Sequence, residues 1–88
     1  MSLLTADDIN ITYGKLDKML LLLGYKHKQV NGAHAVYNNK SSLVVLKRAP
    51  KTYRVPKIIV SSVVNNIVNS NIASPARIKE AYAKAEQS

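Results

Sequence analysis

The chain of 88 residues contains no cysteine and few acidic residues. Without cysteine, disulfide bonds, thiolate metal ligands and a cysteine nucleophile are excluded. The acidic residues are Asp7, Asp8, Asp17, Glu80 and Glu86, so residues 18–79 carry no carboxylate side chain. A two-metal nuclease site and a pair of catalytic carboxylates both need acidic side chains, which this central stretch does not supply. No ligand spacing points to zinc, and we expect neither a metal nor another cofactor.

Long apolar runs are also missing. No run approaches the roughly 20 apolar residues of a membrane span. The N-terminal residues lack the basic-then-apolar order of a secretion signal. We therefore expect a soluble, cytoplasmic protein that has no membrane partner.

Positive charge, by contrast, is abundant. The formal net charge is +8, and apart from Lys15 and Lys84 every lysine and arginine lies within residues 18–79. A surface with so few opposing carboxylates favours a polyanionic partner, and nucleic acid is the first candidate. The alternative is a cationic surface that serves only to keep the protein in solution.

A first helix is predicted for residues 12–23. Apolar residues recur there at steps of three and four, which places them on one helical face: Tyr13, Leu16, Met19, Leu20 and Leu23. Thr12 is a suitable N-cap, and Gly24 can end the helix in the left-handed conformation. Residues 1–11 have no clear period and are expected to be irregular.

Residues 24–37 contain the strongest hairpin signal in the chain. Asn31-Gly32 suits a two-residue type I′ turn, because both central positions of that turn need a positive φ. Such a turn would join strands at residues 25–30 and 34–38. The pairs it predicts are Val30 with Ala33, Gln29 with His34, Lys28 with Ala35, and His27 with Val36.

A third strand and two further helices complete the predicted order. Residues 43–46 form a short apolar run of strand length. In residues 56–70 apolar pairs recur every four residues, which fits one face of a helix and not a strand. Ser74 and Pro75 are a suitable N-cap and first residue for an extra C-terminal helix over residues 75–87. Its apolar stripe, residues 78–85, is narrow, and we expect this helix to dock loosely or onto a partner.

The predicted fold class is α+β, with residues 1–88 forming a single domain. Three antiparallel strands form one sheet in the order helix, three strands, helix, helix. Such a sheet can leave one face to solvent, and helices must then cover the other face to close a core.

This arrangement resembles the HicA family, small mRNA interferases of bacterial toxin–antitoxin pairs. The resemblance covers residues 16–74 and rests on a helix that ends at Gly24, a basic strand, Gly32-Ala33-His34 at a hairpin, and a strand that ends in Tyr37. It implies a double-stranded-RNA-binding-like fold.

The resemblance also implies a function. His34 would be the general base of a metal-independent endoribonuclease, removing the proton from a ribose 2′-OH of mRNA. A HicB-like antitoxin would be the protein partner. The RNA-binding candidates are Lys26, Lys28, Gly32, Tyr37, Lys47, Arg48 and Lys51. Tyr37 could stack on a base or pack in the core, and His27 is expected to be only a strand residue.

The chain departs from the family pattern at two places. Ala33 stands where the family usually has serine, and residues 46–50 lack the histidine that commonly follows the third strand. The alternative hypothesis is therefore a catalytically silent RNA- or DNA-binding module of the same fold. A third hypothesis is an interaction protein whose stripe at residues 78–85 docks on another chain.

Overall fold

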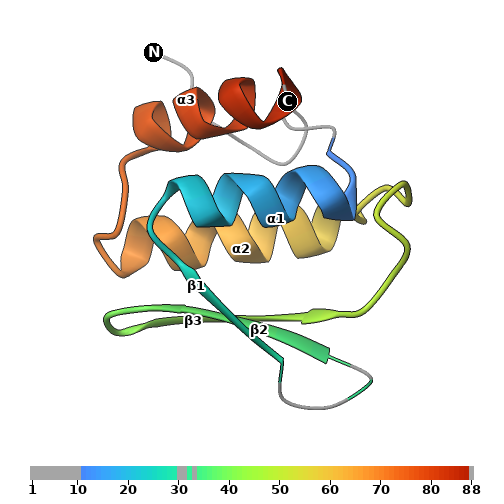
Figure 1. Cartoon of the computed structure of the whole chain (residues 1–88). Coiled ribbons are helices and arrows are strands. Elements are labelled where there is room, and N and C mark those ends of the chain that lie inside the picture. Colours follow the sequence, from blue (N-terminus) through green and yellow to red (C-terminus); the bar gives the residue numbers. More distant parts are fainter. Residues whose placement is uncertain (1–10, 30–31, 33, 88) are drawn as a thin grey trace.

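The computed structural model describes residues 11–29, 32 and 34–87. Along the chain these form α1 (Tyr13–Leu22), β1 (Lys26–Gln29), β2 (His34–Asn39), β3 (Ser42–Lys47), α2 (Lys57–Asn69) and α3 (Pro75–Glu86) (Figure 1). The strands form one antiparallel sheet in the order β1-β2-β3. The predicted α+β fold class and element order are therefore confirmed.

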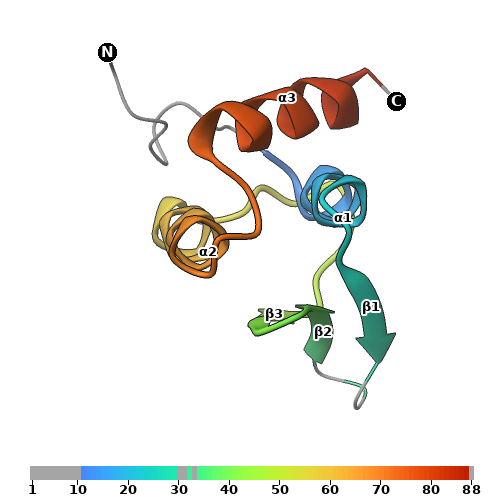
Figure 2. The same cartoon turned by 90° about the vertical axis from the view of Figure 1, so that its left-hand side faces the viewer.

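The elements lie in three layers (Figure 2). The sheet forms one outer layer, α1 and α2 the middle layer, and α3 the other outer layer. All three helices lie on the same side of the sheet, as expected for a sheet that needs cover on one face. Within the described residues, no helix is both long and apolar enough to cross a membrane.

The helix boundaries follow the capping signals in the sequence. The Thr12 side chain accepts a hydrogen bond from the Lys15 amide at 3.3 Å. The Ser74 hydroxyl accepts a hydrogen bond from the Arg77 amide at 3.2 Å, and a proline occupies the first position of α3. Gly24 follows α1 with a φ of +90°, a conformation that glycine adopts without strain.

The core lies between the sheet and the helices and within the helical layers. Its largest fully buried apolar side chains come mainly from the helices, and they are Ile11, Leu16, Met19, Leu20, Ile67 and Ile78.

Residues 1–10 lie outside the described part of the chain. Ile11 belongs to no helix or strand, and its carbonyl accepts a hydrogen bond from the Val55 amide at 2.9 Å.

The expectation that the last helix docks loosely or onto a partner is wrong. Helix α3 packs against both α1 and α2, and Ile78, Ala81 and Ala85 are 0% exposed. The small alanines allow the helices to approach closely, so a narrow stripe suffices to bury this face. A stripe that is buried inside the chain is not available to another chain, which removes the basis of the third hypothesis.

The predicted register of the hairpin is also wrong, by one residue. His27 pairs with Tyr37 instead of Val36, Lys28 with Val36 instead of Ala35, and Gln29 with Ala35 instead of His34. A regular two-residue hairpin would leave an even number of residues between paired positions, whereas the five residues between Gln29 and Ala35 are an odd number. Val30, Asn31 and Ala33, on which the predicted turn and its closing pair rest, lie outside the described residues.

Side-chain alternation defines the two faces of the sheet. In β3, Ser42, Val44 and Leu46 are buried toward the helices, and the residues between them are exposed. Residues paired across strands share a face, and successive residues alternate between faces. The side away from the helices, here called the open face, therefore carries Lys26, Lys28, His34, Val36, Asn38, Leu43, Val45 and Lys47.

Two isoleucine substitutions test whether α3 is an integral part of the fold. Ile78→Ala in α3 removes a side chain that is 0% exposed, whereas Ile58→Ala in α2 removes one that is 78% exposed. We expect Ile78→Ala to lower the free energy of unfolding by about 2–5 kcal/mol and Ile58→Ala to change it much less. Urea denaturation followed by circular dichroism measures both. Equal, small effects would mean that α3 does not contribute to the core.

Candidate functional site

Four of the predicted site residues lie together on the open face. His34, the first residue of β2, pairs with Lys47, the last residue of β3, and both side chains are exposed. Lys26 and Lys28 are exposed on β1, which flanks β2 on its other side. None of the described strands β1, β2 and β3 contains an acidic residue. The open face therefore offers an accessible imidazole amid lysines.

The remaining predicted residues are placed differently. Gly32 is exposed, and a Cβ added there would meet nothing within 4 Å. Tyr37 is 5% exposed and points toward the helices, so of the two alternatives for this ring the structure shows packing. Arg48 and Lys51 follow β3 and line a pocket on the helix side of the sheet.

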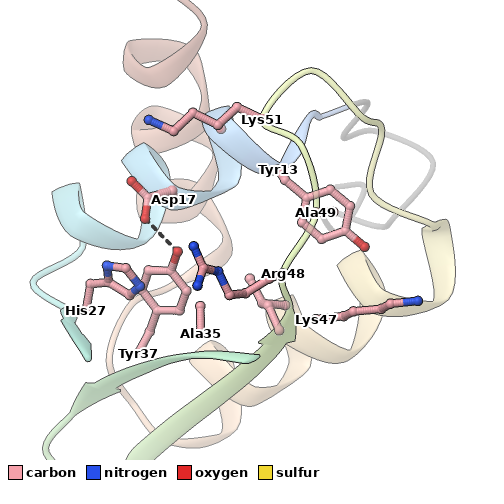
Figure 3. A pocket seen from close by; sticks show the side chains of 11 residues that line it. Tyr13, Asp17, His27, Ala35, Tyr37, Lys47, Arg48, Ala49 and Lys51 are labelled. Carbon is pink, nitrogen blue, oxygen red and sulfur yellow. Dashed lines mark hydrogen bonds between the residues drawn. The ribbon is translucent and has the colours of Figure 1, made fainter. Parts of the chain in front are cut away.

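This pocket, here called the Tyr37 pocket, lies between the start of α1, the helix-facing side of β1 and β2, and the segment after β3 (Figure 3). Its volume is about 270 Å³. Its lining residues are Tyr13, Gly14, Asp17, His27, Ala35, Tyr37, Leu46, Lys47, Arg48, Ala49 and Lys51. It combines aromatic rings, small apolar side chains, one carboxylate and three cations.

Backbone hydrogen bonds hold the cationic wall of the pocket against α1. The first amides of a helix have no partner within the helix. Here the Tyr13 amide donates to the Tyr53 carbonyl at 2.9 Å, and the Gly14 amide donates to the Lys51 carbonyl at 3.0 Å. A Cβ on Gly14 would lie 3.0 Å from the Lys51 Cβ, so glycine permits this close approach. The segment that carries Arg48 and Lys51 is thereby fixed beside the helix.

Asp17, Tyr37 and His27 lie beside one another in the lining of the pocket (Figure 3). The Tyr37 hydroxyl donates a hydrogen bond of 2.5 Å to Asp17 Oδ1, and the His27 ring stacks on the Tyr37 ring with centroids 4.9 Å apart. Burial, followed by the hydrogen bond to Asp17 and the charge of that carboxylate, strongly raises the pKa of the Tyr37 hydroxyl. Tyr37 therefore stays protonated and directs its proton to Asp17 well beyond neutral pH.

Sequence reasoning missed His27 and Asp17 as members of a site. His27 was assigned the wrong partner because the register was taken from the turn. A better signal was Tyr25, which directly precedes β1 and is buried, because in extended backbone the residue two positions later points to the same face. Asp17 carried a signal as well, since it is the last carboxylate before a long basic stretch.

Comparison with models of protein families, with curated proteins and with solved structures gives no match to this chain. Within the part of the chain that the structure describes, no three His, Asp or Glu side chains gather as a group that could hold a metal ion. The function is therefore inferred from the geometry and chemistry of the open face and the pocket.

The hydrogen bond between Tyr37 and Asp17 predicts a pH-dependent stability. The pKa of Tyr37 is higher in the folded than in the unfolded state. The contribution of this hydrogen bond to the free energy of unfolding is therefore fully present below about pH 10, the ordinary tyrosine value, and is lost as the pH rises further. Tyr37→Phe should lower the free energy of unfolding by about 1–3 kcal/mol at pH 8, and this difference from wild type should shrink by pH 11. Urea denaturation over this pH range measures it.

Tyr53→Phe is the matched control, since Tyr53 is largely exposed. Its difference from wild type should stay near zero across the pH range. If the Tyr37→Phe difference instead stays constant up to pH 11, the hydroxyl of Tyr37 does not titrate with folding in the way described.

Proposed function

We propose that the protein is a metal-independent endoribonuclease that resembles the HicA toxins, with His34 as the general base. The observation that supports this most is the exposed pair of His34 and Lys47 at one end of the open face. A catalytic group fixed on a strand loses little freedom when it engages a substrate. A ring buried in the core could not reach a polynucleotide, whereas this one lies on the surface.

The chemistry needs only groups that the open face and the RNA provide. The neutral imidazole of His34 accepts the proton of a ribose 2′-OH, and the 2′-oxygen attacks the adjacent phosphorus. The bond from phosphorus to the 5′-oxygen breaks, and that oxygen takes up a proton from solvent water, to which His34 then returns the proton that it accepted. The products are a 2′,3′-cyclic phosphate and a 5′-hydroxyl. Lys47 stabilises the charge on the phosphoryl oxygens, and Lys26 and Lys28 contact neighbouring phosphates.

The open face also fits the proposed HicB-like partner. Leu43 and Val45, on β3, are 55% and 53% exposed beside the lysines of the sheet. Exposed apolar side chains with a charged rim are typical of protein–protein interfaces. An acidic antitoxin on this face would cover His34 and exclude mRNA, which would restrain the activity in the cytoplasm.

The direct test is cleavage of labelled single-stranded RNA in EDTA. We expect wild type to produce fragments that end in a cyclic phosphate and to leave DNA of the same sequence intact, because DNA has no 2′-OH. His34→Ala should slow cleavage by about 10²–10⁴-fold while binding RNA with nearly unchanged affinity. An exposed histidine is replaced, so the variant should keep its fold and unfolding midpoint.

Either of two results would reject this assignment. Cleavage by His34→Ala at the wild-type rate would remove His34 as the base. Wild-type protein that binds RNA and DNA alike and cuts neither would establish the alternative, a silent nucleic-acid-binding module.

The role of the open-face lysines is tested by the salt dependence of RNA binding. Each phosphate contact contributes a released counterion, so Lys28→Ala should reduce the slope of log K against log salt by about one. Lys79→Ala is the control, because Lys79 is exposed on α3, in the layer farthest from the sheet. Fluorescence anisotropy between 50 and 200 mM salt, roughly the range in which such slopes are resolved, measures both. Equal slopes for the two variants would show that RNA does not follow the open face.

A further inference from the structure

The Tyr37 pocket has no role in the chemistry proposed for the open face. His34 and the Tyr37 side chain lie on opposite faces of β2, so the pocket does not hold the general base. The two regions meet at Lys47, which pairs with His34 and also lines the pocket. A polynucleotide held at His34 therefore lies beside Lys47, which also lines the pocket.

The size and walls of the pocket suit one flat ring. Its volume of about 270 Å³ lies just below the roughly 300 Å³ at which pockets for drug-sized ligands begin. Three aromatic rings line it, from Tyr13, His27 and Tyr37. Tyr37 is buried and already stacked on His27, so Tyr13 and His27 are the rings available to stack on a nucleobase. The remaining apolar wall comes from small or aliphatic side chains, among them Ala35 and Leu46.

The charges of the pocket specify the ligand further. Lys47, Arg48 and Lys51 are the cations of its lining (Figure 3), and cations of this kind attract phosphate. The single carboxylate, Asp17, would repel a phosphate, so it serves another part of the ligand. Among the described residues Tyr37 is its one hydrogen-bond partner, and a carboxylate has about four acceptor positions. Asp17 thus retains acceptor capacity for N–H donors of a ligand.

Guanine is the base whose donors match a carboxylate best. Its N1–H and its N2 amino group are adjacent on one edge, so both oxygens of a carboxylate can accept from it side by side. Adenine and cytosine each present one amino group there, and uracil presents one N–H. Paired bonds to a charged acceptor are both stronger and more selective than a single bond.

We propose that the Tyr37 pocket binds a guanine base, with Asp17 accepting hydrogen bonds from its N1–H and N2 amino groups. The Tyr37 hydroxyl orients the carboxylate from the side, and Arg48 and Lys51 face the phosphate. This inference deepens the proposed function and rests on it for RNA being the natural ligand. It makes Asp17 the residue that selects guanosine next to the site of cleavage.

The test is binding of mononucleotides to the folded, isotope-labelled protein, followed by NMR. We expect guanosine monophosphate to bind about tenfold more tightly than inosine monophosphate, which lacks the N2 amino group, and than adenosine monophosphate. Amide signals of Ala35 and Ala49 should shift. Asp17→Asn should lose this preference and bind guanosine monophosphate about tenfold more weakly.

Glu80→Gln is the matched control, because it makes the same change in net charge on the exposed surface of α3, where Glu80 pairs with Arg77. It should keep the wild-type preference. Equal binding of all three nucleotides by wild type, or an unchanged preference in Asp17→Asn, would overturn the proposal and leave a plain anion site. The comparison of nucleotides on wild type decides the matter even if Asp17→Asn does not fold.

The mononucleotide experiment is independent of cleavage. A protein that prefers guanosine monophosphate but cuts no RNA would support the pocket and reject the nuclease. A protein that cuts RNA without regard to guanine and shows no preference among nucleotides would reject the pocket and support the nuclease.

Discussion

The alternation of side chains along β2 is the constraint on which the rest of the molecule depends. Tyr37 points toward the helices and His34 points away from them, because they stand three positions apart on one strand. One strand therefore contributes to two surfaces with different chemistry. The helix side provides a carboxylate, aromatic rings and a pocket that is open to solvent, whereas the open side provides an exposed imidazole and lysines. A shift of one residue would exchange the two sets.

The layers of the fold stabilise this division. Helix α1 lies between the sheet and α3, so its buried side chains are held from both sides and Asp17 is kept over the sheet. The first amides of α1 bind carbonyls of the segment after β3, which positions Arg48 and Lys51. The pocket is thus built by elements from distant parts of the chain, while the groups of the open face belong to neighbouring strands.

Local signals predicted most of the fold but not the details that position the site. Thr12, Gly24 and Ser74 marked helix ends correctly because capping is a property of a few adjacent residues. The predicted register was wrong because it was taken from Asn31-Gly32 alone. The faces on which His27 and Tyr37 lie depend on the whole pairing of β1 with β2. The prediction that α3 docks loosely failed because a stripe of alanines is weakly apolar by composition, yet it packs closely when another helix lies against it. His34, Lys26, Lys28 and Lys47 were all named from the sequence, but the predicted pairing of His34 with Gln29 would have put Lys26 and Lys28 on the opposite face, so they share the open face with His34 only in the observed register.

The side chain of Asn66 has a consequence for how this protein behaves at high concentration. From α2 it donates a hydrogen bond of 2.7 Å to the Leu43 carbonyl, and its own oxygen accepts one of 2.7 Å from the Ser42 hydroxyl. Strand β3 is an edge of the sheet, and exposed edges are templates on which strands of other molecules add. With the Leu43 carbonyl already engaged and a helix fastened along that edge, an incoming strand meets an occupied position. The same amide that secures α2 to the sheet thereby removes one of the acceptors that strand addition at β3 would use.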